Sequence, residues 1–199
     1  FPFATKLDMS FLGKDGKGRA YENITTAAVI AKNEFRYGYM EIRCKAANAS
    51  ITSSFWGTGK GSELDVFEFV GAPSKPEDKN VERRFQSNII DWSQKEKGER
   101  RKWRGKHFFD WRPADAFHVY GCEWNEKEIK FFADGKQIQA ITRQELGEGW
   151  VLTQPLWLWV DSETFPWDGL PTKESLPADF EIDYIRVWQK GQAPGQLHP

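Results

Sequence analysis

The chain has 199 residues, 39% of them apolar and 29% charged, and a formal net charge of −1 at pH 7. This composition fits one soluble globular domain, and the near-neutral charge argues against a protein that mainly neutralises phosphate, so we expect no nucleic-acid partner. No apolar run approaches the roughly 18 residues of a membrane span, so we expect no membrane partner. The ten Trp residues suit a surface that stacks on sugar rings.

The predicted elements are short strands, many of them alternating or rich in β-branched and aromatic residues, and no segment carries a sustained helical stripe. The longest loops are expected at 72–80 and 93–107, and 191–199 is expected to be a tail. In chain order, the expected strands lie within residues 25–35, 36–47, 51–57, 63–70, 83–91, 117–124, 128–141, 156–162 and 179–189.

These strands predict an all-β fold in which two antiparallel sheets pack as a sandwich or jelly roll. Asp134-Gly135 lies between two apolar runs and predicts a hairpin, because Gly accepts the positive φ of such turns. We find no internal repeat, so residues 1–190 are expected to form a single domain. Cys44 and Cys122 have no metal-ligand spacing, and we expect two inert thiols rather than a disulfide.

The segment "GSELDVFEFVG", residues 61–71, places three carboxylates in a strand that is otherwise apolar. Side chains alternate along a strand, so Glu63 and Asp65 share a face and Glu68 should point the other way. A β-bulge between Asp65 and Glu68 would bring all three acids to one face, and bulges recur next to active sites. The alternative is a surface strand whose acids simply alternate toward solvent.

Three adjacent carboxylates in a partly desolvated site cannot all stay charged, so one of them should keep its proton. Glycoside cleavage needs this combination, with an ionised carboxylate to attack the anomeric carbon and a neutral acid to protonate the leaving oxygen. Retaining enzymes place the two carboxyl groups about 5–5.5 Å apart, and inverting enzymes about 6.5–9.5 Å apart. The spacing of Glu63 and Glu68 is compatible with the shorter distance.

The residues also carry a family resemblance. "ELDVFE" resembles the E-[IL]-D-x-x-E signature of the bulged members of glycoside hydrolase family 16, which are retaining enzymes with a β-jelly-roll fold and a concave substrate groove. Further segments that resemble family motifs are "FRYGYMEIRCKA", "SSFW", "FHVYGCEWNEKEIKFFADGK" and "FEIDYIRVWQ". The resemblance implies that Glu63 is the nucleophile, that Glu68 is the acid/base, and that Asp65 hydrogen-bonds the nucleophile and tunes its charge.

The resemblance also implies a set of substrate-binding residues. Trp56 resembles a stacking platform beside the cleavage point, with a core Trp as the alternative. Glu163 resembles a subsite acid of agarose-type enzymes, with a rim acid as the alternative. The full set of expected substrate-binding residues is Trp56, Arg84, Gln86, Asn88, Trp159, Glu163 and Arg36.

"ELDVFE" and the segment that closes the domain resemble the red-algal galactan branch of the family, which includes agarases, porphyranases and carrageenases. The segment 95–107 holds seven basic and two acidic residues, and Arg and Lys there would suit a sulfated polymer, because Arg pairs with oxyanions. We therefore favour hydrolysis of β-1,4 linkages in porphyran over agarose. A laminarinase-like β-1,3-glucanase and a κ-carrageenase stay as alternatives.

Two other classes of protein agree less well with the sequence. A non-catalytic polysaccharide-binding protein would not need all three acids, and a nucleic-acid binder is weakly supported by one basic segment in a near-neutral chain. The chemistry requires no cofactor and no catalytic metal, although the family resemblance allows a structural calcium with ligands near the termini. The family's N-terminal segment has no counterpart here. We expect a monomer that is secreted, periplasmic or bound at the cell surface, since its substrate is a polymer.

Overall fold

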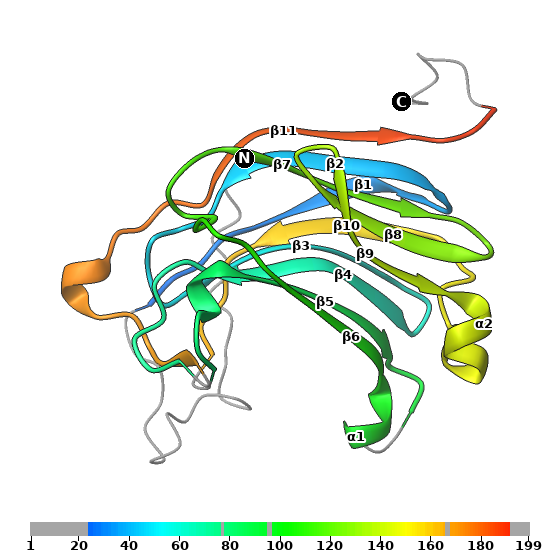
Figure 1. Cartoon of the computed structure of the whole chain (residues 1–199), viewed down its shortest axis with the longest axis horizontal. Coiled ribbons are helices and arrows are strands. Elements are labelled where there is room, and N and C mark those ends of the chain that lie inside the picture. The colour runs from blue at the N-terminus through cyan, green and yellow to red at the C-terminus, as the bar shows by residue number, and fades with distance from the viewer. Residues whose placement is uncertain (1–23, 77, 95–96, 166–167, 192–199) are drawn as a thin grey trace.

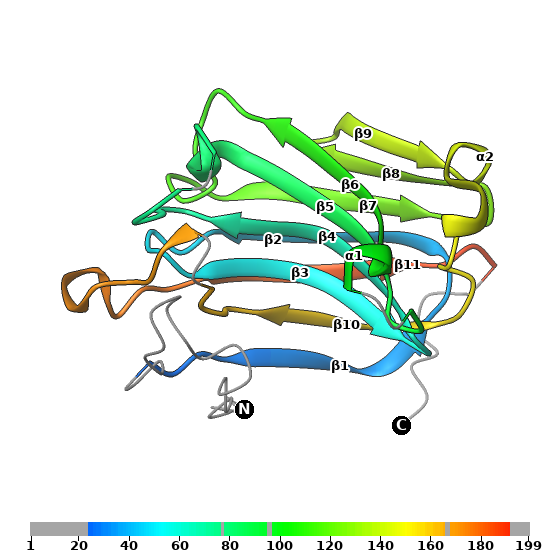
Figure 2. The same cartoon turned by 90° about the horizontal axis from the view of Figure 1, so that it is seen from below.

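The computed structural model describes residues 24–76, 78–94, 97–165 and 168–191. Two antiparallel sheets stack face to face, as Figures 1 and 2 show. This arrangement confirms the all-β sandwich that the sequence predicts. Sheet A has the order β1 (Ala28–Phe35), β10 (Leu156–Asp161), β3 (Thr52–Gly59), β4 (Ser62–Val70), β5 (Arg84–Asp91) and β6 (Arg101–Phe108). Sheet B has the order β11 (Glu181–Trp188), β2 (Gly38–Lys45), β7 (His118–Trp124), β8 (Glu128–Ala133) and β9 (Lys136–Thr142).

Helices are short in the described part of the chain. The α-helices are α1 (Lys97–Arg100) and α2 (Arg143–Leu146), and 3-10 turns cover Val81–Arg83, Gly147–Gly149 and Lys173–Ser175. Thr142 caps α2 through a capping box with Glu145, in which each side chain bonds the backbone N–H of the other residue, and this satisfies N–H groups at the start of the helix.

The core lies between the sheets and is rich in aromatic rings. Phe67 and Phe69 of β4 stack with ring centroids 4.3 Å apart, and Phe69 lies 4.9 Å from Tyr120 of sheet B. All three side chains are buried, and full burial of one such side chain stabilises a fold by about 1.5–3 kcal/mol. Cys44 and Cys122 belong to the same core as buried free thiols, which confirms that they form no disulfide.

Two hairpin turns have both central residues at positive φ. The predicted turn at Asp134-Gly135 joins β8 to β9 with φ values of 47° and 76°, and Lys60-Gly61 joins β3 to β4 with φ values of 45° and 83°. Gly adopts such angles without a Cβ clash. The Asp134 carboxylate also accepts the Val119 backbone N–H at 2.9 Å, so it ties the hairpin to the neighbouring strand.

The structure corrects one sequence expectation, the loop at 93–107. Residues 101–108 form β6, which pairs with β5 along the edge of sheet A. Trp103 turns inward and stacks on Phe131 with parallel rings 5.6 Å apart, while Arg104 and Lys106 point outward and are exposed. The sequence did not predict this strand because its many Lys and Arg residues resemble a solvated loop. Edge strands commonly carry such charged residues.

The inner side of β11 is less covered than the rest of the core. Ile182, Ile185 and Val187 pair with buried residues of β2, so they turn toward the sandwich interior. Their exposed fractions are nevertheless 38%, 38% and 40%. Residues 1–23 and most of the expected tail at 191–199 lie outside the described residues.

Candidate active site

The three carboxylates of β4 share one face of sheet A because the strand carries a β-bulge. Phe55 of β3 pairs with Phe67, and the next residue, Trp56, pairs with Asp65, so Val66 has no partner on β3. Val66 and Phe67 both turn into the core, and this extra inward residue returns Glu68 to the face of Glu63 and Asp65. The predicted bulge is therefore confirmed, and β4, which carries it, lies between β3 and β5 in sheet A (Figure 1).

Asn88 of β5 binds two of the acids. Its Nδ2 donates to Asp65 Oδ2 at 2.8 Å and to Glu68 Oε2 at 3.0 Å, which holds the two carboxyl groups side by side. Gln86 of the same strand also hydrogen-bonds Glu68. Side chains alternate along β5, with Gln86 and Asn88 on the acid face and Phe85 buried in the core.

Burial changes the acidity of all three acids. It is the largest cause that raises the pKa of Glu63, of Asp65 and of Glu68 above their ordinary values. For Asp65, the charges of Glu68 and Glu63 add to burial, and together they raise the pKa well above its ordinary value. Asp65 therefore holds a proton more readily than an ordinary aspartic acid, and it hydrogen-bonds Glu63, as the family resemblance implies for this position.

Glu63 and Glu68 have different partners that favour their charged forms. For Glu63, hydrogen bonds from Trp92 and Asp65 lower the pKa against the effect of burial. For Glu68, a bond from Gln86 and then the charges of Arg101 and Arg104 lower the pKa in the same way. Positive charge therefore lies on the β6 side of the cluster, next to Glu68.

Trp56 and Trp159 form a stacked pair beside the acids. Their rings lie 5.0 Å apart with an interplanar angle of 29°, since the two residues pair directly across β3 and β10. Trp56 Nε1 donates to Asp161 Oδ2 at 3.2 Å. Burial raises the pKa of Asp161 to about 7 and that of Glu163 to about 8, and the charges of the other acids add to both.

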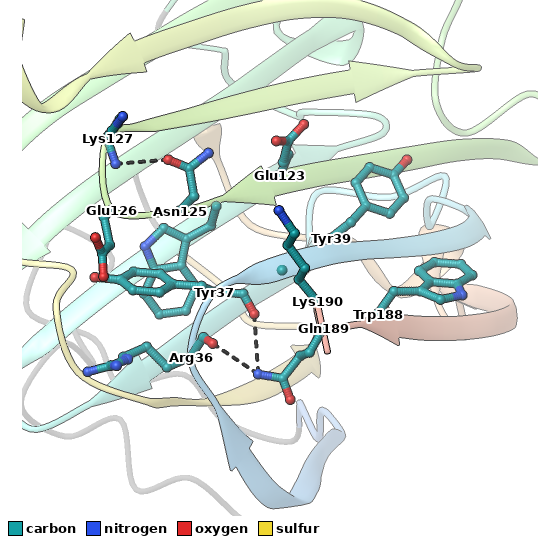
Figure 3. Close-up of a pocket in the computed structure, with 12 residues that line it drawn as sticks. Arg36, Tyr37, Tyr39, Glu123, Asn125, Glu126, Lys127, Trp188, Gln189 and Lys190 are labelled. Atoms are coloured by element: carbon teal, nitrogen blue, oxygen red, sulfur yellow. Dashed lines mark hydrogen bonds between the residues drawn. The ribbon is translucent and has the colours of Figure 1, made fainter. Parts of the chain in front are cut away.

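The two arginines of the expected set lie in different places. Arg84 lies on β5 and is buried, and it pairs with Asp78 at 3.3 Å and Asp168 at 3.5 Å, while its charge also lowers the pKa of Glu68. Arg36 is not brought to the acids. It lines a pocket of about 760 Å³ with Tyr37, Tyr39 and Trp188, at the β2 and β11 side of sheet B (Figure 3), and its guanidinium lies 5.1 Å from the Tyr37 ring centre.

Sequence reasoning missed Trp92 and placed Arg101 and Arg104 in a loop. Trp92 follows β5 directly, and its Nε1 donates to Glu63 Oε2 at 2.9 Å. Its only signal was its position immediately after an expected strand of the acid face. The signal for the arginines was the alternation of Trp103 and Gly105 with basic residues, which is typical of an edge strand.

The described residues contain no group of three or more His, Cys, Asp or Glu side chains arranged to hold a metal ion. The structural calcium was expected near the chain termini, and those segments lie outside the described residues. Among the described helices, none is long and apolar enough to cross a membrane.

Comparisons with known proteins agree with the resemblance found in the sequence. Residues 4–190 match the family model described as "Beta-porphyranase A-D, GH16 domain". The β-porphyranase B of Phocaeicola plebeius is 29% identical, over 89% of this chain and 66% of that protein. A β-glucanase of Fibrobacter succinogenes is 32% identical, over 88% of this chain and 49% of that protein.

A solved structure shows the same fold. The crystal structure of porphyranase B from Zobellia galactanivorans superposes with a TM-score of 0.68 and 25% identity, over 85% of this chain and 70% of that one. The chain spans only 60–66% of the length of the curated porphyranases that match it most significantly.

Proposed function

The chain belongs to glycoside hydrolase family 16, as the match over residues 4–190 shows, and from this premise we propose that it is a retaining endo-glycosidase. Its proposed substrate is a red-algal galactan, cleaved at β-1,4 linkages, with porphyran preferred over agarose. The observation that carries the proposal is the bulge of β4, which gathers Glu63, Asp65 and Glu68 on one face in three different environments.

In the proposed mechanism, a carboxylate oxygen of Glu63 attacks the anomeric carbon while the glycosidic bond breaks and Glu68 gives its proton to the leaving oxygen. Glu63 is then joined to the sugar as an ester. In the second step Glu68 takes a proton from water, the water oxygen bonds the anomeric carbon, and Glu63 leaves as a carboxylate. Asp65 and Glu68 both carry a proton at the start of this mechanism, because burial raises the pKa of each. Asp65 donates its proton in a hydrogen bond to Glu63 and is held in place by Asn88.

Three observations support a sulfated polysaccharide as the substrate. Arg101 and Arg104 of β6 lie close enough to Glu68 to lower its pKa, so positive charge flanks the proposed cleavage point. Arginine pairs well with sulfate oxygens because its donors form a planar fork. The stacked pair Trp56 and Trp159 offers an apolar surface for a sugar ring. Porphyranases are also among the most similar curated relatives.

The first experiment is to incubate the purified protein separately with porphyran, agarose, κ-carrageenan and laminarin, and to measure the size of the oligosaccharides released. We expect short products from porphyran. Cleavage of laminarin instead would keep the carboxylate roles and reject the galactan substrate, and similar β-glucanases make this the leading alternative. No cleavage of any polymer would favour a binding protein.

Two variants test the roles of the acids. Glu63→Gln and Glu68→Gln should each abolish turnover while oligosaccharide binding stays within a few-fold of the wild type, because amide and carboxyl groups have nearly the same shape. Near-normal turnover of Glu68→Gln would refute its assignment as acid/base. The first-formed product, followed by its anomeric proton signal, should keep the β configuration of the substrate.

The remaining proposals follow from this activity. The mechanism uses no cofactor. A polymeric substrate places the protein outside the cytoplasm, in a secreted, periplasmic or cell-surface location, and we propose that it works as a monomer.

A further inference from the structure

Trp92 is fixed at the rim of sheet A by its backbone. Its N–H donates to the carbonyl of Gly61 at 2.7 Å, and Gly61 belongs to the β3–β4 turn at a φ of 83° that favours glycine. Trp92 thus has one defined position relative to β4. Its side chain is 48% exposed, yet its indole N–H points inward to Glu63 Oε2 at a distance of 2.9 Å.

A second contact orients the ring. The guanidinium of Arg100 in α1 lies 5.3 Å from the centre of the Trp92 ring, and a cation over an indole face is attracted by its π electrons. Arg100 is itself held by a bond from its Nε to the Gln94 carbonyl at 2.8 Å. The turn after β5 and the helix α1 therefore both influence the orientation of the Trp92 indole ring.

We propose that Trp92 is a positioning residue for Glu63, whose indole N–H binds one carboxylate oxygen, favours the charged form and leaves the other oxygen to attack the sugar. The proposal rests on the proposed function, since it assumes that Glu63 is the nucleophile. It goes beyond that function by assigning the orientation of the nucleophile to a residue that directly follows the neighbouring strand β5.

The chemistry of both steps agrees with this role. A hydrogen bond to a carboxylate is stronger than one to a neutral ester, so the Trp92 bond weakens when Glu63 Oε1 bonds the anomeric carbon and its negative charge is lost. The bond strengthens again in the second step, when water replaces Glu63 and the carboxylate reforms. Trp92 therefore stabilises Glu63 as the leaving group of the second step.

The charge on Glu63 depends on its whole surroundings. Burial and the charge of Glu68 raise its pKa, and the bonds from Trp92 and Asp65 lower it. Loss of the Trp92 bond should therefore raise the pKa of Glu63. The charged or titratable groups that face the cluster are Asp65 and Glu68 of β4, Asp161 and Glu163 at the end of β10, Arg84 of β5, Arg100 of α1, and Arg101 and Arg104 of β6.

The first test needs no substrate. In protein labelled at the tryptophan indole nitrogens, the Trp92 N–H resonance is identified by its loss in Trp92→Phe and is followed as a function of pH. We expect it to shift as Glu63 titrates, and to lose that transition in Glu63→Gln. The Trp188 resonance is the internal reference, because Trp188 is equally exposed at 48% but lies on sheet B. An identical pH response in wild type and Glu63→Gln would overturn the proposal.

The second test uses the cleaved polymer. Trp92→Phe keeps an aromatic ring and removes the N–H, so the acid limb of kcat/KM should move up by about 0.5–1 pH unit with KM changed less than about threefold. Trp188→Phe should leave the profile unchanged. An unmoved acid limb in Trp92→Phe would contradict the role. If the wild type cleaves no polymer, the proposed function fails, while the resonance titration still decides whether Trp92 controls Glu63.

Discussion

Five carboxyl groups share one face of sheet A, and their environments make each of them different. Glu63, Asp65 and Glu68 come from the bulged strand, while Asp161 and Glu163 come from the end of β10. Asp65 is held between Asn88 and Glu63, whereas Asp161 accepts a single bond from Trp56 and leaves its Oδ1 buried without a hydrogen-bond partner. A buried oxygen of this kind favours the protonated form.

Asp161 should therefore make the fold less stable as pH rises. Its pKa is raised to about 7 in the folded protein, against about 3.9 in an unfolded chain. Between these values the folded state binds a proton that the unfolded state does not, so the free energy of unfolding falls as pH rises from about 4 to about 7. For a shift of about three units, the fall is at most about 4 kcal/mol.

Asp161→Asn tests this linkage, because asparagine cannot ionise and its Oδ1 can still accept the Trp56 N–H. Unfolding by denaturant at several pH values should show that the variant gains stability relative to the wild type as pH rises. It also removes a charge that raises the pKa of Glu163. Glu148→Gln, an exposed acid after α2, is the matched control. A constant difference between variant and wild type across the pH range would contradict the raised pKa.

At the scale of single residues, the sequence predicted the acids well and their partners only in part. The alternation of β5 places Asn88 and Gln86 on the acid face, and this follows from strand geometry alone. The bond from Trp92 was not predicted, because it depends on how the chain turns after Asp91. The position of Arg36 at the pocket in sheet B also depends on a turn, the one between β1 and β2. The identity of one residue does not indicate in which direction its side chain points from a turn.

Among the elements, β4 is the one whose irregularity matters most. The bulge places Val66 between Asp65 and Phe67 with no partner on β3, and the register of β4 against β3 shifts by one residue between the pairs Phe55–Phe67 and Trp56–Asp65. Without Val66, Asp65 and Glu68 would be two residues apart and would still share a face. The bulge therefore sets the local twist and spacing of the acids, and the pairing of Ser54 with Glu68 sets their register.

Deletion of Val66 should leave an active enzyme with reduced stability. All three acids stay on one face, and the loss is the buried Val66 side chain, worth about 1.5–3 kcal/mol, together with the bond from Ser87 Oγ to the Val66 carbonyl at 2.9 Å. Deletion of Leu64 is the contrast, because it places Glu63 next to Asp65, so that the two acids must point to opposite faces.

Thermal unfolding and product release should separate the two deletions. We expect measurable turnover for the Val66 deletion and none for the Leu64 deletion, with both variants folded by circular dichroism at low temperature. Complete loss of turnover in a folded Val66 deletion would mean that the bulge itself sets the distance that catalysis requires.

Strand β6 was hidden from sequence reasoning because its charges resemble those of a solvated loop. The structure shows that basic side chains of β6 lie on one face of the sheet. Arg101 and Arg104 lie on the acid side, and Trp103 and Gly105 turn toward the core. The two faces of β6 therefore have different roles, one toward the acids and one toward the core. Only the pairing of β6 with β5 shows which residue lies on which face.

If Arg101 binds sulfate, Arg101→Gln should raise KM for porphyran about fivefold, equivalent to about 1 kcal/mol, and should leave KM for neutral agarose within about twofold. The wild-type KM for porphyran should also rise with salt more steeply than that of the variant. Lys136→Gln on β9 is the control, as an exposed cation on sheet B. Equal effects on both polymers would show that Arg101 acts on Glu68 alone and binds no sulfate.

In the molecule as a whole, two sheets of antiparallel strands were predictable from alternation and turns, and the family signature was readable from ordered segments across the chain. Less predictable was the incomplete cover over β11, where Ile182, Ile185 and Val187 stay partly exposed. The burial of a strand residue depends on which segment packs against it, and the alternation of apolar residues in the sequence does not identify that segment. The chain spans 60–66% of its porphyranase relatives.

The free thiols have a consequence for how the protein folds. Cys44 and Cys122 are the only cysteines of the chain, and both are buried as thiols whose pKa is raised by burial. No disulfide therefore joins β2 to β7, the strands of sheet B that carry the two cysteines, and folding needs no oxidant. The melting temperature should be the same with and without a reducing agent, and a thiol reagent should label neither cysteine in the native protein and both after unfolding. Native protein should thus form in a reducing cytoplasm as readily as in an oxidising compartment.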